Sequence, residues 1–447
     1  MSGRTTSQAE VLDEGSAAWA LAVIVASAAA SLLCGYELLR STANTLFVTA
    51  YGRHALPAII ALTIVGVSLV TYGYGRLLSW LGPRRTLHAS TVLAMLTMLA
   101  CYAAIRLDPV GSKPVTGLLY IFKESYIVLL IEQCWSFINS KLTRKAAKVL
   151  NGVICGIASI GAVSGGLLLR YLSERWGTLQ MVPLAALGTL PTLFLVEWMY
   201  RRYGEPRGAD STLPADKAAA AQHRHDEDPL SLRLFRRERL LLLLILLVAT
   251  KECMGSLVDL GFQYELKQQF ADAADKQNAY SGTFFAWING IAMGFQLVLT
   301  PLLLTFVRTR WVHVSIPAIH LALLTNFVLR PSLVSASLAL MAFKIIDYSV
   351  FRAAKELLYV PLSFDARYRA KELIDVLGNR ASKGLTSLSI TALQSLGVAF
   401  AAGSFALGGL VGAGVWLVLA FPLTASEHTE SAARPATGAD AGTGAAS

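Results

Sequence analysis

The chain has 447 residues, of which 54% are hydrophobic and only 15% are charged, and its mean hydropathy is +0.53. Because a soluble domain carries about 25% charged residues, this composition excludes a soluble globular fold and indicates a surface largely covered by lipid. The net charge of +10 fits basic loops on the cytoplasmic side of a membrane. It argues against nucleic-acid binding, which would concentrate the charge in one soluble domain.

The first residues, 1–16, are polar, do not read as a cleavable signal, and are expected to be cytoplasmic. From there to residue 423, apolar stretches long enough to cross a bilayer recur about twelve times. Two halves are predicted, residues 17–200 and 239–423, joined by a polar cytoplasmic linker, 201–238, and followed by a disordered cytoplasmic tail, 424–447. The predicted spans are 17–40, 55–79, 86–106, 115–138, 149–172, 179–200, 239–263, 281–307, 311–329, 332–360, 372–393 and 396–423.

Basic residues concentrate in alternate loops, which predicts that both termini lie in the cytoplasm. The inner loops carry Arg84, Arg85, Lys141, Arg144, Lys145, Lys148, Arg308, Arg310, Arg367, Arg369 and Lys371. The predicted fold class is therefore an all-α polytopic membrane protein with about twelve transmembrane helices in two halves of six, an arrangement that resembles the major facilitator fold.

The loop between the second and third spans supports this resemblance. Residues 75–85 read G-R-L-L-S-W-L-G-P-R-R, which is similar to the major facilitator signature G-x-L-x-D-x-x-G-R-R. That signature braces the cytoplasmic side through charge and tight turns. Ser79 stands at its acidic position, so a weaker brace is expected; the alternative is an ordinary basic turn.

Span ten carries far more charge than a lipid-facing helix tolerates. Lys344, Asp347, Phe351 and Lys355 recur at helical spacing and are predicted to share one face, while Arg352 and Glu356 form an i, i+4 pair beside it. Such residues are expected to face an aqueous pathway. Two alternatives remain open: Arg352, Lys355 and Glu356 snorkel to the cytoplasmic surface, or Lys344 and Asp347 simply pair with each other.

The other charged spans fit a cavity between the halves. Span one ends with Glu37 and Arg40, span four contains Lys123 and Glu124, and span seven contains Lys251, Glu252 and Asp259. Glu124 shares a helical face with Val128, Glu132 and Trp135. Spans one, four, seven and ten line the cavity of a two-half transporter, so Lys and Arg there predict an anionic substrate bearing phosphate or carboxylate. Span eleven also contains Asp375, Arg380 and Lys383.

Several kinds of chemistry find no support in the sequence. Residues 378–384, G-N-R-A-S-K-G, do not fit the nucleotide-hydrolysing phosphate loop. The five cysteines are scattered and form no CxxC, which argues against a zinc site or a disulfide framework. No nucleophile–base pair occurs at usable spacing. The protein is therefore predicted not to be an enzyme and to need neither metal nor cofactor.

Several segments, in order along both halves, resemble the transporters that exchange ATP for ADP in plastids and obligate intracellular bacteria. Residues 347–362, D-Y-S-V-F-R-A-A-K-E-L-L-Y-V-P-L, are similar to that family's K-Y-S-x-F-D-P-x-K-E-M-A-Y-I-P-L. Residues 369–376, R-A-K-E-L-I-D-V, resemble K-G-K-A-A-I-D-V, and residues 36–44, Y-E-L-L-R-S-T-A-N, resemble Y-x-I-L-R-D-T-K-D.

The resemblance implies a nucleotide exchanger and assigns roles to matched residues. Lys355 and Glu356 match charges critical for transport, Asp259 replaces a glutamate, and Glu124 matches the glutamate of span four. Ala43 stands where the family has a lysine, which puts the ATP/ADP substrate in doubt. Arg40 or Arg352 could compensate for that missing positive charge.

The leading hypothesis is a secondary transporter for nucleotides or a related phosphorylated anion, working by alternating access. Lys355, Arg40 and Arg352 would attract phosphate, and Asp259, Glu124 and Glu356 would pair with these bases when the site is empty. The alternatives are a major facilitator permease for another solute, with proton coupling, and a membrane scaffold or sensor that no longer transports. A bacterial inner membrane is expected, because no long organellar presequence precedes the first span. The sequence makes no prediction of the oligomeric state.

Overall fold

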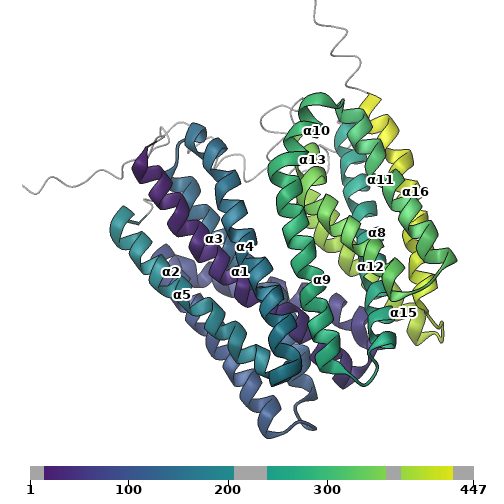
Figure 1. Ribbon diagram of the computed structural model, residues 1–447, viewed down its shortest axis with the longest axis horizontal. Helices are drawn as coiled ribbons and strands as arrows, with labels where there is room; N and C mark the ends of the chain where they lie inside the picture. Colours follow the sequence, from purple (N-terminus) through teal and green to yellow (C-terminus); the bar gives the residue numbers. More distant parts are fainter. Residues whose placement is uncertain (1–14, 206–238, 359–373, 426–447) are drawn as a thin grey trace, which may run out of the picture.

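The computed structural model describes residues 15–205, 239–358 and 374–425, and within these ranges every regular element is a helix. Figure 1 shows the helices as two bundles side by side, one from each half of the chain. The predicted all-α class is confirmed. The predicted terminal segments and most of the predicted linker lie outside the described residues.

The first bundle consists of α1 (Ser16–Tyr51), α2 (Leu56–Leu107), α3 (Lys113–Lys141), α4 (Arg144–Trp176) and α5 (Met181–Tyr203). Short 3-10 turns, η1 (Arg53–Ala55) and η2 (Thr178–Gln180), precede α2 and α5. Helix α2 breaks at Gly82, whose φ of 73° is positive, and Pro83 follows without a backbone donor. The break divides α2 into the two spans predicted at 55–79 and 86–106.

The second bundle consists of α8 (Arg239–Gln269), α9 (Ala274–Gly294), α10 (Thr300–Phe306), α11 (Thr309–Leu329), α12 (Leu333–Ile346), α13 (Arg352–Leu358), α15 (Ser382–Ser395) and α16 (Ala402–Ala425). Within the described part of this bundle lie three π-helical turns: η4 (Phe295–Leu299) joins α9 to α10, η5 (Asp347–Phe351) joins α12 to α13, and η6 (Ile374–Ala381) leads into α15. Span ten is therefore α12, η5 and α13 in sequence.

Ten segments among the described residues are long and apolar enough to cross a membrane. The sequence predicts about twelve. One of the ten, Arg53–Leu107, holds two predicted spans on either side of Gly82, and span eleven begins in residues outside the described ranges. Bulky apolar side chains such as Leu69, Phe194 and Val418 are about two-thirds exposed, as a lipid-facing surface requires. The protein is an integral, multi-pass membrane protein.

The two bundles touch along α4 and α9 and along α2 and α15. Glycines allow the first contact, because a Cβ on Gly166 would lie 2.6 Å from the carbonyl oxygen of Gly282. In Figure 1 the bundles converge toward the end at which α1 finishes and diverge toward the end at which it begins. We call these the closed end and the open end.

The signature loop of residues 75–85 is braced within the first bundle. The Arg84 guanidinium pairs with the Glu197 carboxylate of α5, and His88 Nε2 lies 3.3 Å from the same carboxylate. Ser79 Oγ instead donates to the Gly75 carbonyl oxygen of its own helix, at 2.8 Å. Glu197 thus supplies the acidic partner in this loop region, and Ser79 takes no part in the brace.

Candidate functional site

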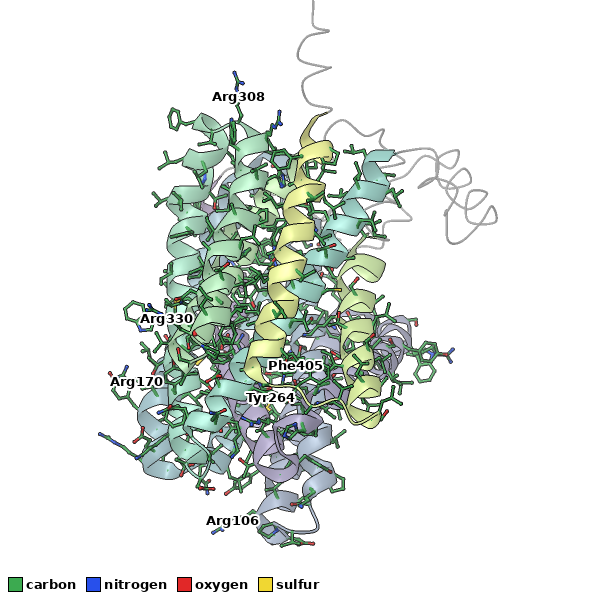
Figure 2. The ribbon with its side chains drawn as sticks, turned by 90° about the vertical axis from the view of Figure 1, so that its right-hand side faces the viewer. Arg106, Arg170, Tyr264, Arg308, Arg330 and Phe405 are labelled. Atoms are coloured by element: carbon green, nitrogen blue, oxygen red, sulfur yellow. The ribbon has the colours of Figure 1, made fainter. Side chains whose placement is uncertain are left out.

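At the closed end, side chains from the two bundles bond to one another. Arg53 Nη1 donates to the Tyr264 carbonyl oxygen at 3.1 Å, and the Tyr264 hydroxyl lies 3.1 Å from His54 Nδ1. Gln394 Nε2 donates to the same hydroxyl at 3.3 Å. Figure 2 shows Tyr264, packed against Phe405, toward the end that carries Arg106 and away from the end with Arg308.

Two further polar contacts and a shared core extend this closure. The backbone N–H and hydroxyl of Thr178 both donate to Asp275 Oδ1 at 2.6 Å. Asn278 Nδ2 donates to Thr42 Oγ1 at 3.1 Å. Apolar residues of the first bundle also belong to the hydrophobic core of the second, among them Phe47, Val48, Leu56, Ile59 and Tyr120. The closed end is therefore sealed by both polar and apolar contacts.

A buried ion pair on α1 begins the charged region at mid-depth. Arg40 Nη2 donates to Glu37 Oε2 at 2.5 Å, and both side chains are almost fully buried. Asn289 of α9 donates to the other Glu37 oxygen at 3.1 Å, and the Arg40 guanidinium lies 3.5 Å from the centre of the Phe285 ring. Arg40 is thus neutralised and covered, which links α1 to the opposite bundle and leaves it little surface for a substrate.

Lys251 ties α8 to span ten. Its Nζ lies 2.5 Å from Glu252 Oε1 and 2.7 Å from Asp347 Oδ1, and the lysine is buried. The sequence left open a pairing between Lys344 and Asp347. The carboxylate of Asp347 instead forms its ion pair with Lys251 on a different helix, and it remains within electrostatic range of Lys344.

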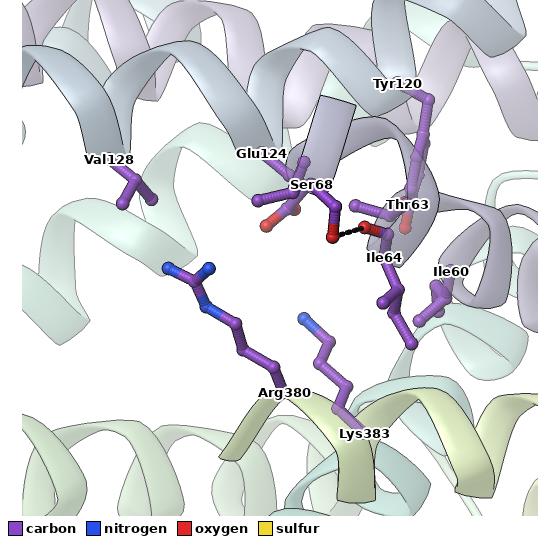
Figure 3. A pocket seen from close by; sticks show the side chains of 10 residues that line it. Ile60, Thr63, Ile64, Ser68, Tyr120, Glu124, Val128, Arg380 and Lys383 are labelled. Atoms are coloured by element: carbon purple, nitrogen blue, oxygen red, sulfur yellow. Dashed lines mark hydrogen bonds between the residues drawn. The ribbon is translucent and has the colours of Figure 1, made fainter. Parts of the chain in front are cut away.

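A cavity of about 180 Å³ lies at mid-depth between the two bundles (Figure 3). Glu124 from α3 enters it from one side, and Arg380 and Lys383 from η6 and α15 enter it from the other. Lys123 Nζ already pairs with Glu124 Oε1 at 2.5 Å. The hydroxyl-bearing and apolar wall comes from α2 and α3: Ile60, Thr63, Ile64, Val67, Ser68, Tyr120 and Val128.

Lys344 does not line this cavity but lies within electrostatic range of Glu124, which does. Among the described residues, Lys344, Arg380 and Lys383 have no carboxylate within 4.0 Å. Each is a positive charge within a membrane-spanning region that forms no direct ion pair with a described carboxylate, although Asp259, Asp347 and Glu252 lie within electrostatic range of Lys344. An entering anion could bind these cations directly.

A second cavity, of about 290 Å³, lies next to the first along α3, on the side of the open end. Trp135 and Tyr348 contribute rings to its wall, and Asn289 and Gln296 contribute amides. Arg352 of α13 is exposed and lines it as well. The remainder is apolar or small: Val25, Ala29, Leu33, Ile131, Cys134, Ile154, Cys155, Ala158, Ser159, Ala292 and Met293.

The predicted site residues fall into three groups. Glu124 lines the first cavity and Arg352 lines the second. Arg40, Asp259, Lys344 and Asp347 line neither cavity but interact electrostatically with Glu124, Tyr120, Tyr348 or Arg352, which do. Lys355 and Glu356 lie further along α13, and Lys355 is about 16 Å beyond Lys344 at the helical rise per residue. They line neither cavity.

The prediction that Phe351 shares the pathway face with Lys344 is wrong. Its ring is buried and packs edge-on against His313 of α11 and Trp416 of α16, inside the second bundle. The physical reason is the π-helical turn η5, which begins three residues after Lys344 and ends at Phe351, and whose wider turn rotates Phe351 relative to its place on a regular α-helix.

Arg380 and Lys383 were not among the predicted site residues. They lie in span eleven, outside the set of spans expected to line the cavity, yet Figure 3 shows both side chains directed into it. Two cations three residues apart within an apolar span were the signal in the sequence. No group of three or more potential metal ligands occurs among the residues that the structure describes.

The two halves of the chain form two helical bundles that meet along α4 and α9. This arrangement is the major facilitator fold. No protein-family model and no curated protein matches the sequence. Among solved structures, the chain is similar to the nucleoside transporter NupG, at a TM-score of 0.63 and 13% identity over 91% of this chain and 99% of that one. It is also similar to a D-xylose–proton symporter, at a TM-score of 0.62 and 12% identity over 89% of this chain and 97% of that one. A third similar structure is a POT family transporter in complex with a thioalcohol-conjugated peptide, at a TM-score of 0.61 and 10% identity over 91% of this chain and 96% of that one.

A structure of XylE, a proton:xylose symporter of the major facilitator superfamily, is similar at a TM-score of 0.58 and 14% identity over 91% of this chain and 96% of that one. These identities are low, so the likeness shows the fold alone. The agreement covers nearly the full length of both chains, and it therefore includes both bundles.

Proposed function

We propose that the protein is a secondary transporter of a phosphorylated organic anion, with nucleotides of the ATP and ADP type as the leading substrates. One observation carries the proposal: Lys344, Arg380 and Lys383 converge between the two bundles with no carboxylate within 4.0 Å among the described residues. Positive side chains are the donors that bind phosphate through charge-assisted hydrogen bonds. A substrate with several negative charges matches this cluster.

Alternating access explains why the cluster lies between the bundles. The closed end is sealed by contacts of Arg53, Thr178 and Tyr264, whereas the bundles diverge toward the open end (Figure 1). Rocking the bundles about the midplane would open the closed end and expose the same cations to the other side. If the basic loops are cytoplasmic, the open end faces the cytoplasm and both termini lie there, in a bacterial inner membrane.

The resemblance to ATP/ADP exchangers supports the nucleotide as substrate, and the cavity supplies a replacement for the lysine missing at Ala43. Arg380 and Lys383 bring two cations into the cavity beside Glu124. Lys355 lies toward the open end, where its positive charge would attract the substrate on its way to the cavity, and Glu356 follows it on α13. In this proposal Arg40 does not bind phosphate directly. It pairs with Glu37 and so helps to hold the two bundles together.

The test is exchange in liposomes. Purified protein is reconstituted in vesicles preloaded with ADP, and uptake of labelled ATP is followed. We expect uptake that requires internal nucleotide. Lys344→Ala and Lys383→Ala should each lower it at least about ten-fold, because a hydrogen bond to a charged group contributes about 1.5–3 kcal/mol. Lys355→Ala should affect uptake less than either.

The matched control is Arg330→Ala, which removes an exposed cation directly after α11 (Figure 2) that lines neither cavity. It should transport like the unmodified protein. Absence of uptake of any phosphorylated anion by well-folded protein would sink the proposal and favour a membrane scaffold or sensor.

A second candidate function is proton-coupled transport of another solute. Asp259 favours it, because this carboxylate lies at mid-depth and has no basic partner within 4.0 Å among the described residues. Carboxylates within membrane-spanning segments mark ion and proton pathways. Uptake into empty vesicles that follows an imposed pH gradient, and disappears in Asp259→Asn, would favour this function over exchange.

A further inference from the structure

We infer that the cavity lined by Trp135 and Tyr348 is a second substrate subsite, which holds an aromatic heterocycle while the cation cluster holds the phosphates. The inference rests on the proposed function and names the substrate class more narrowly. The substrate would be an anion with a planar ring at one end, such as a nucleotide, and not a sugar phosphate or an inorganic anion.

Successive turns of α3 line the two cavities. Glu124 and Val128 of α3 line the first, and the next turns of the same helix, with Ile131 and Trp135, line the second. Seven residues separate Glu124 from Ile131, a rise of about 10 Å along the helix. A molecule with a phosphate chain and a base at opposite ends has a comparable length.

Tyr348 relates the second cavity to Lys344. It lines the second cavity, its ring centre lies 6.0 Å from Lys344 Nζ, and it interacts electrostatically with Arg40. One substrate could therefore contact Lys344 at its charged end and Tyr348 nearer its ring. No other described aromatic residue lines the second cavity apart from Trp135.

The side chains that form the wall of the second cavity suit a flat heterocycle. Trp135 and Tyr348 offer ring faces for stacking, and the small side chains of Ala158 and Ala292 leave room for a flat group. The amides of Asn289 and Gln296 can read ring nitrogens and exocyclic groups, which an apolar pocket alone could not distinguish. A volume of about 290 Å³ is of the size that small-molecule sites have.

Arg352 completes this wall at its open side. It is exposed and has no carboxylate within 4.0 Å among the described residues. A guanidinium is planar, stacks on aromatic faces and donates to ring acceptors, which makes it a partner for a heterocycle as well as for phosphate.

The experiment compares binding of ADP and of pyrophosphate to the full-length protein in detergent, by titration calorimetry. Pyrophosphate carries two linked phosphates without a base. ADP should bind at least about ten-fold more tightly, since stacking of a base on an aromatic side chain is worth that much. Trp135→Ala should lower the affinity for ADP about ten-fold and leave the affinity for pyrophosphate unchanged. Trp135→Phe should keep most of the affinity for ADP. Trp198→Ala, which removes a half-exposed tryptophan of α5, is the matched control.

The outcomes separate this inference from the proposed function. The assignment of the ring subsite would be overturned by equal affinity for ADP and pyrophosphate. It would also be overturned if Trp135→Ala lowered the affinity for both ligands to the same extent. Lys344→Ala and Lys383→Ala should weaken both ligands, because both carry phosphate. If neither variant changes either affinity, or neither ligand binds, the proposed function fails together with the subsite.

Discussion

At the residue scale, most charges within the spans are neutralised by a neighbour, and the few that are not define the site. Glu37 and Arg40 pair with each other, and Lys251 pairs with Asp347 and Glu252. A buried pair survives only when both partners remain, because either alone is an uncompensated charge in a low-dielectric environment. The paired residues therefore serve architecture, which is the role we assign to Arg40.

The first prediction concerns this pair. Glu37→Gln should lower the free energy of unfolding by about 3–5 kcal/mol, because Arg40 is left buried without its counter-charge. The double variant Glu37→Gln, Arg40→Gln should be destabilised less than Glu37→Gln alone. Thermal unfolding in detergent measures both. Equal stability of Glu37→Gln and the unmodified protein would show that Arg40 finds another partner.

At the element scale, glycines decide how closely the helices approach, and their positions on α4 differ in this respect. A Cβ on Gly161 would lie 2.0 Å from the Ala30 carbonyl oxygen of α1, and one on Gly166 would meet α9. A Cβ on Gly152 would meet nothing within 4 Å. Adding a Cβ at Gly161 or Gly166 would therefore disturb helix packing, whereas adding one at Gly152 would not. The sequence alone does not distinguish these positions.

The second prediction uses this contrast. Gly161→Ala should destabilise the protein by about 1–3 kcal/mol, because backbone atoms of α1 must move to make room. Gly152→Ala on the same helix should be neutral or slightly stabilising, since alanine favours helix more than glycine does. Side-by-side melting curves of the two variants measure the difference. Similar melting temperatures would contradict the close packing of α1 on α4.

At the scale of the whole molecule, the two bundles form one closed end whose opening is required for alternating access. Thr178 and Asp275, whose side-chain oxygens lie 2.6 Å apart, come from different bundles. A covalent link between these positions would hold the closed end shut. Transport requires the bundles to separate there, so such a link should stop the cycle.

The third prediction follows from this closure. Thr178→Cys and Asp275→Cys, introduced together after the five native cysteines are replaced by alanine, should cross-link on oxidation and abolish uptake in vesicles. Reductant should restore uptake, and each cysteine alone should have no such effect. Undiminished uptake by fully cross-linked protein would mean that the closed end does not open during transport.

The sequence by itself determined the fold class and the approximate spans, because hydropathy and chain length are local properties and a bilayer imposes one length on every crossing helix. It also singled out Glu124, Asp259 and Lys344 as charges inside membrane spans. Only the tertiary structure decided which charges are cancelled, since ion pairing depends on distances between helices that hydropathy does not encode. In the structure Asp347 pairs with Lys251, and Phe351 at η5 packs inside the second bundle and not on the pathway. Arg380 and Lys383 line the cavity.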